Sequence, residues 1–139
     1  MNKSPPPRTQ YTRVIIYMKC FKRLFCLFLT GGAIYCVIEL LYRRRTHPSM
    51  FAAGGAALLA ADGIRRLKVR HKKLIRSSLC TCAFTLIELA FGLFLNRKLK
   101  KKIWDYSKLP FNYKGQICLP FTIAWAALSL PAMGICSLF

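Results

Sequence analysis

The stretch "SSLCTCAFTLIELAFGLFLN" (residues 77–96) lies between Arg76 and Arg97, and its only charged residue is Glu88. An apolar helix of about 20 residues is long enough to cross the ~30 Å hydrocarbon core of a bilayer. The stretch therefore predicts a membrane-spanning helix that carries one acidic residue near its middle.

Three more apolar stretches lie between clusters of basic residues. Residues 24–42 carry Glu39 as their only charge, residues 46–64 carry only Asp62, and residues 115–139 carry none. Because the second is apolar only from Met50 onward, it indicates a short, tilted or re-entrant helix. We predict an all-α fold, an integral membrane bundle of four transmembrane helices, at about 24–42, 48–64, 77–96 and 116–138. A soluble helix bundle is the alternative.

The composition excludes an ordinary soluble globule. The chain has 139 residues, of which 55% are apolar, yet its net charge is +19. The basic residues flank the apolar stretches and are not interleaved with stacking aromatics, so we expect no nucleic-acid partner. We predict a disordered basic, Pro-rich tail over 1–20 and a single membrane domain over 21–139. The first apolar run lacks a small-residue cleavage site, which favours a retained anchor over a signal peptide.

The distribution of Lys and Arg predicts the orientation. The N-terminal tail has six and the segment 65–76 has seven, against three at 43–45 and seven at 97–114. Positive charge concentrates on the cytoplasmic side, so we expect both termini in the cytoplasm. The basic clusters should also bind anionic lipid headgroups, at about 1 kcal/mol per residue near the surface.

Acids within predicted spans are the candidate functional residues. Such groups cost roughly 2.5–3.5 kcal/mol on insertion and often mark pathways or pairing sites. Glu39 can pair with Arg43, and Asp62 with Arg65 or Arg66. Glu88 has no cation within one helical turn and lies on a stripe of small or polar residues with Ser78, Thr81, Thr85 and Gly92.

We take Glu39, Glu88, Thr81 and Thr85 as a candidate intramembrane polar site. Three roles are open to Glu88: a neutral acid hydrogen-bonded to its Ser/Thr stripe, a partner for a basic group on another helix, or a protonatable group on a transport path. For helix packing, the sequence offers a row of small residues, Ala53, Ala57 and Ala61, beside Gly54 and Gly55.

No pattern indicates catalysis or metal binding. The seven cysteines form no CxxC and lie mostly in apolar stretches, which favours packing over metal ligation or a reactive thiol. The sequence contains no nucleophile–base pair and no HExxH, so we predict no enzymatic activity, no catalytic residue, no metal and no cofactor.

The segment "KIWDYSKLPFNYKGQICLPF" (102–121) is the most distinctive loop. Its aromatic residues are typical of the membrane interface, so we predict an interfacial aromatic loop over 102–115. Either it folds back into the headgroup region or it is a plain interfacial anchor. Its candidate motif residues are Trp104, Asp105, Tyr106, Ser107, Pro110, Asn112, Gly115 and Gln116.

This motif, with Ile117, Cys118, Phe121 and Trp125, resembles that of a bacterial membrane family known as the putative ABC-transporter type IV, or putative ABC transporter permease, family, common in Firmicutes. Weaker similarities are Glu39, Tyr42, His47, Ser49, Met50, Gly54, Gly55 and Glu88, so the resemblance covers about residues 31–130. The basic loops and the Pro-rich tail depart from that family's pattern. The resemblance implies a multi-spanning protein and assigns no substrate or catalytic residue.

These observations favour a permease-like subunit of a transport assembly. The chain has no G-x-x-x-x-G-K-[ST] phosphate loop, so an ATPase would be a separate subunit. Four short spans form a small pore wall, which favours a homo-oligomer. The alternative is a non-transporting membrane protein that binds anionic lipid or scaffolds a membrane partner.

Overall fold

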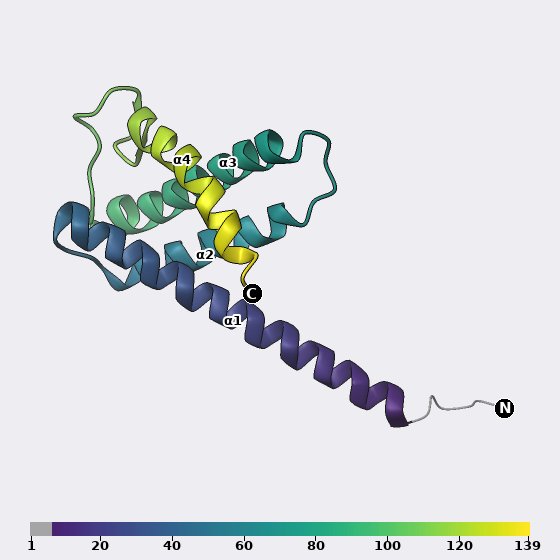
Figure 1. Cartoon of the computed structure of the whole chain (residues 1–139). Helices are drawn as coiled ribbons and strands as arrows, with labels where there is room; N and C mark the ends of the chain where they lie inside the picture. Colours follow the sequence, from purple (N-terminus) through teal and green to yellow (C-terminus); the bar gives the residue numbers. More distant parts are fainter. Residues whose placement is uncertain (1–6) are drawn as a thin grey trace.

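The protein is an all-α bundle, as predicted (Figure 1). The computed structural model describes residues 7–139, and the side chains from Gln10 onward. Within that range a two-stranded antiparallel hairpin precedes the last helix. The elements are α1 Pro7–Arg43, α2 Pro48–Arg65, α3 Lys72–Gly92, the π-helical turn η1 Leu93–Lys98, β1 Asn112–Tyr113, β2 Ile117–Cys118 and α4 Leu119–Cys136.

Helix α1 begins much earlier than residue 24, where the sequence places its start. It has 37 residues, and residues 7–20 of the tail predicted to be disordered are helical; residues 1–6 lie outside the described part. The physical reason is local: Pro7 suits a first helical position, and no Gly or Pro follows before Gly31. At about 1.5 Å per residue, α1 is roughly 55 Å long and projects beyond the bundle (Figure 1).

Within the described part of the chain, three helical stretches are long and apolar enough to cross a membrane, namely Gln10–Arg43, Lys72–Lys98 and Leu119–Cys136. Helix α2 has only 18 residues and packs against the other three helices. Its buried face includes Met50, Leu58 and Asp62, so α2 is the central element of the bundle. This position explains why its sequence is rich in Ala and Gly and gives a weaker membrane-span signal.

Glycines allow α1 and α2 to approach each other closely. A methyl group on Gly31 of α1 would lie 2.5 Å from the carbonyl oxygen of Gly54, and one on Gly54 would lie 2.5 Å from that of Gly31. The predicted alanine row is less central: Ala53 and Ala61 are buried and Ala57 is partly buried. The pairing of Gly31 with Gly54 is the feature that sequence analysis missed.

The last helix begins at Leu119, three residues later than predicted. Gln116 precedes it, and Ile117 and Cys118 pair with Tyr113 and Asn112 in the hairpin. Cys118 has extended backbone angles (φ −152°, ψ 160°), and Pro120 occupies the first turn, where a missing N–H costs least. Gln116 is therefore free to bond within the loop.

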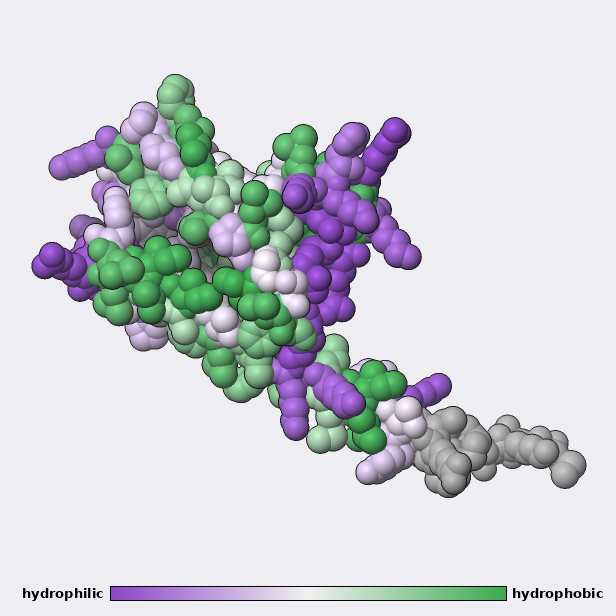
Figure 2. Space-filling view, in the orientation of Figure 1, coloured by the Kyte–Doolittle hydropathy of each residue, from purple (hydrophilic) through white to green (hydrophobic). Residues whose placement is uncertain are grey.

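Figure 2 shows hydrophilic side chains gathered at two ends of an apolar body. The apolar body exposes large side chains from α1, α3 and α4, among them Leu41, Leu86 and Ile123. Exposed apolar surface between two charged ends is the pattern of a chain surrounded by lipid. The projecting part of α1 lies beyond one of these ends.

Candidate functional site: Glu88 and the α1–α4 cleft

Glu88 is the acidic residue of α3, and it is only 6% exposed. Its Oε1 accepts a hydrogen bond of 2.9 Å from the Tyr106 hydroxyl, and its Oε2 accepts one of 2.9 Å from the Trp125 indole Nε1. Both carboxylate oxygens are therefore satisfied by neutral donors, which keeps the acid buried without a cation. The three residues come from α3, the loop after η1, and α4.

The predicted Ser/Thr stripe does not bond Glu88. Thr81 donates to the carbonyl oxygen of Ser77 on its own helix, and the Thr85 hydroxyl is buried without a partner. Ser77 instead meets Ser129 of α4 at 2.5 Å. Threonines in helices can bond the backbone of their own helix, as Thr81 does, so the Thr81 hydroxyl is not a partner of the acid.

The loop from Leu99 to Cys118 folds back onto the bundle. Trp104 is not an interfacial anchor: it is 7% exposed and packs with Met50 and Leu95 in a small core. Its indole Nε1 donates to the carbonyl oxygen of Gln116 at 3.0 Å. The loop motif thus has an inward-facing half.

Asn96 fastens this half to the end of η1. Its Nδ2 donates to the carbonyl oxygen of Trp104 and to Oε1 of Gln116, and its Oδ1 accepts from the backbone N–H of Ile103 at 2.7 Å. Sequence analysis missed Asn96, although it is the only neutral polar residue at the boundary between the apolar stretch and the following basic cluster.

The outward half of the loop is held by its own side chains. Asp105 accepts from the backbone N–H of Ser107, and Asn112 bonds three backbone groups, those of Ser107, Leu109 and Gly115. The Tyr106 N–H donates to the carbonyl oxygen of Gly115 at 2.8 Å. Gly115 has φ +69°, where a Cβ would meet Asp105 at 2.7 Å, so glycine is required there. Together these bonds fix the position of Tyr106.

Two groups in this loop have shifted pKa values. Burial, with the nearby charge of Glu88, raises the pKa of the Tyr106 phenol, so Tyr106 stays a hydrogen-bond donor. The hydrogen bond from the Ser107 N–H lowers the pKa of the exposed Asp105 carboxyl. Pro110 is exposed and lies between Leu109 and Phe111 in the loop.

Glu39 forms the predicted local pair with Arg43. Arg43 donates to Oε1 of Glu39 and also to the carbonyl oxygen of Ile103, at 2.9 Å. Thr46 donates to Oε2 of Glu39 at 2.9 Å. Arg43 therefore ties the end of α1 to the start of the loop that carries Tyr106.

Asp62 has a further partner from a distant element. Besides the expected Arg65 and Arg66, it accepts two hydrogen bonds of 2.7 Å from Arg23 of α1. Arg23 also donates to the carbonyl oxygen of Phe139. This cluster gathers α1, the end of α2 and the C-terminus at one end of the bundle.

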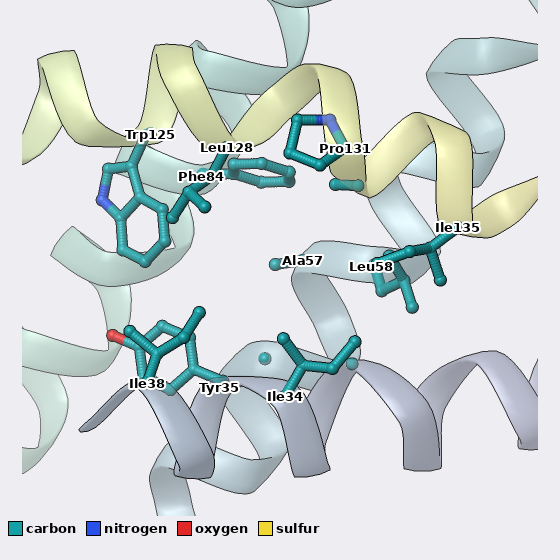
Figure 3. A pocket seen from close by; sticks show the side chains of 13 residues that line it. Ile34, Tyr35, Ile38, Ala57, Leu58, Phe84, Trp125, Leu128, Pro131 and Ile135 are labelled. Carbon is teal, nitrogen blue, oxygen red and sulfur yellow. The ribbon is translucent and has the colours of Figure 1, made fainter. Parts of the chain in front are cut away.

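A cleft runs between α1 and α4 over α2 (Figure 3). Its apolar part has a volume of about 160 Å³ and is lined by residues such as Ile34, Leu58 and Ile135. A second part, of about 270 Å³, is lined by Glu39, Arg43 and Tyr106. The two parts share four lining residues, Tyr35, Ile38, Trp125 and Leu128. Glu88 lies behind Trp125, at the wall of the cleft.

Among the side chains from Gln10 onward, no group of three or more His, Cys, Asp or Glu residues could hold a metal ion. The seven cysteines are free, and Cys80, Cys118 and Cys136 are buried. Cys80 and Cys136 belong to the main apolar core with Leu27 and Phe84.

A family model described as putative ABC-transporter type IV matches residues 47–138. The matched range contains α2, α3, the loop and α4, and therefore all the partners of Glu88. Neither a curated protein nor a solved structure matches the chain.

Proposed function

We propose that this chain, which belongs to the putative ABC-transporter type IV family, is a permease-like subunit of a membrane transport assembly. The observation that carries this proposal is the buried carboxylate of Glu88 at the wall of a cleft between two helices. Acids inside membrane bundles commonly mark the path of a substrate or proton.

The ATPase of this assembly is a separate chain in our proposal, because the sequence holds no phosphate loop. The projecting part of α1 supports an assembly. It exposes Tyr11 (71%), Tyr17 (73%) and Phe21 (70%). In our proposal this part lies outside the bilayer, where exposed aromatic surface is typical of a contact with another protein. The chain itself has no enzymatic role in this account.

We place the chain in the inner membrane of a bacterium, with the projecting end of α1 in the cytoplasm. The charge count of the sequence favours that orientation. The Arg23–Asp62 cluster supports one common side for the N-terminal part of α1 and the C-terminus. A homo-oligomer would enlarge the pore wall beyond what one bundle provides.

The test is purification of the tagged full chain from native membranes in mild detergent, followed by mass spectrometry. We expect a stoichiometric ATPase to copurify. A variant with Tyr11, Tyr17 and Phe21 changed to Ser should insert normally and lose that partner. Recovery of the chain without any ATPase in every mild detergent would contradict the proposal.

The two charged ends favour a second function, binding of anionic lipid or of a membrane partner without transport (Figure 2). The same purification separates the two functions. Anionic lipid or another membrane protein, recovered in place of an ATPase, supports the second. In the first, Glu88→Gln should also abolish transport while leaving insertion unchanged.

A further inference from the structure

The polar part of the α1–α4 cleft is walled by aromatic rings. Tyr35, Tyr42, Tyr106, Phe121 and Trp125 all line it. Their packing is mutual: Tyr106 stacks on Phe121 with ring centres 4.5 Å apart, and Tyr35 stacks on Trp125 at 5.7 Å. Aromatic walls of this kind attract organic cations, because the faces of the rings carry negative electrostatic potential.

Two acidic residues lie at this part of the cleft. Two of the four acids of the chain are there, since Glu39 lines the cleft and Glu88 lies directly behind Trp125. One guanidinium, that of Arg43, faces them, and it is already bonded to Glu39 and to the carbonyl oxygen of Ile103. In the lining itself Glu39 and Arg43 balance each other, so Glu88, behind the Trp125 ring, is the additional acid beside this part of the cleft.

The other part of the cleft is apolar. Its lining contains no charged residue, and its walls come from α1 on one side and α4 on the other (Figure 3). Tyr35, Ile38, Trp125 and Leu128 border both parts, so the apolar part and the aromatic part of the cleft lie next to each other. A ligand that fits both ends has a hydrocarbon tail and a cationic head.

We propose that the α1–α4 cleft binds an amphiphilic organic cation, with the cationic head among the aromatic rings beside Glu39 and the hydrocarbon tail against Ile34, Leu58 and Ile135. The ligand enters sideways from the bilayer, between α1 and α4. That this ligand is also the transported substrate rests on the proposed function; its binding does not.

The test uses the purified full chain in micelles of an uncharged maltoside detergent. Dodecyltrimethylammonium is titrated by calorimetry, and dodecyl sulfate, which has the same tail and the opposite charge, is the matched control probe. We expect saturable binding of one cation per chain and no saturable binding of the sulfate to the cleft. Equal binding of both probes, or none of the cation, would overturn the proposal.

Variants locate the site. Glu39→Gln should weaken cation binding about tenfold, which corresponds to about 1.4 kcal/mol. Asp62→Asn, which changes a buried acid at the end of α2 and outside the lining of the cleft, should leave binding unchanged. If Glu39→Gln does not fold, Ile38→Trp decides, because it fills the cleft where its two parts meet and should abolish binding. Unchanged binding in the variant that folds would overturn the proposal.

Light scattering on the same samples tests a competing occupant, a second copy of the chain. A dimer that excludes the cation, and that Ile38→Trp dissociates, would overturn the proposal. This outcome differs from failure of the proposed function, which is measured by copurification of an ATPase and does not involve the probe.

Discussion

The indole Nε1 of Trp125 lies 2.9 Å from Oε2 of Glu88, and this hydrogen bond joins α4 to α3. The ring of the same Trp125 stacks on Tyr35 of α1, with ring centres 5.7 Å apart. One side chain therefore connects three helices and separates the buried acid from the cleft. The loop completes the arrangement from the other side, through the Tyr106 hydroxyl.

The crossing of α1 and α2 gives the first prediction. Gly54→Ala should destabilise the protein by about 1–3 kcal/mol, because its methyl group would collide with backbone of Gly31. Gly63→Ala on the same helix is the matched control, since nothing lies within 4 Å of its added methyl group. In thermal unfolding measured in detergent, Gly54→Ala should unfold at a lower temperature than wild type, and Gly63→Ala at the same or a higher temperature. Equal effects of both would contradict the crossing.

The Asp62 cluster predicts unequal coupling to its arginines. Arg23 approaches Asp62 with two bonds of 2.7 Å and a side chain 19% exposed, whereas the Arg66 side chain is 57% exposed. Double-mutant cycles with Asp62→Asn should therefore give a larger coupling free energy for Arg23→Met than for Arg66→Met, which should be near 0–1 kcal/mol. The reverse order would show that α1 is not anchored there.

The hydrogen bonds of Asn96 should determine how often the loop between Leu99 and Cys118 opens. Asn96→Leu removes three hydrogen bonds to Trp104, Gln116 and Ile103, so the loop should open more often. Trypsin should then cleave after Lys101 or Lys108 several-fold faster than in wild type. Cleavage after Lys68, in the segment between α2 and α3, is the internal control and should keep its rate. Unchanged cleavage after Lys101 and Lys108 would contradict the role of Asn96.

The hydrogen bond between Asp105 and Ser107 should make part of the free energy of unfolding depend on pH. Its folded pKa is lowered, so its contribution is present above the unfolded value of about 3.9 and is lost as the pH falls through the folded value. Asp105→Asn should therefore flatten the decrease in stability below about pH 4 relative to wild type. Identical acid profiles for the two proteins would indicate that the bond to Ser107 does not contribute.

Contacts between residues that are close along the chain could be predicted from the sequence, and most contacts between residues far apart along the chain could not. Glu39 and Arg43 are one helical turn apart, so their pair follows from helix geometry. Tyr106 and Trp125 lie 18 and 37 residues from Glu88, and no local pattern specifies them as its partners. The loop motif is distinctive in the sequence, but aromatic residues are common at membrane interfaces, so the sequence predicts an interfacial loop and leaves open whether it is a plain anchor.

Two other differences have the same kind of cause. The start of α1 was misplaced because Lys19, Lys22 and Arg23 interrupt the apolar run, although Lys and Arg are good helix formers. The Gly31–Gly54 contact needs small residues on both helices, and the row of small residues on α2 does not by itself specify its partner on α1. The glycine pair at 31–32 was the available signal.

The central claim is that the loop delivers the Tyr106 hydroxyl to the buried carboxylate of Glu88, and a double-mutant cycle tests it most directly. Tyr106→Phe should lower the unfolding free energy of wild type by about 1.5–3 kcal/mol, because a bond to a carboxylate is lost. In the Glu88→Leu background, which has no acceptor, the same change should cost far less. Tyr113→Phe, at a half-exposed position in the same loop, should cost little in either background. Equal losses from Tyr106→Phe in both backgrounds would contradict the account.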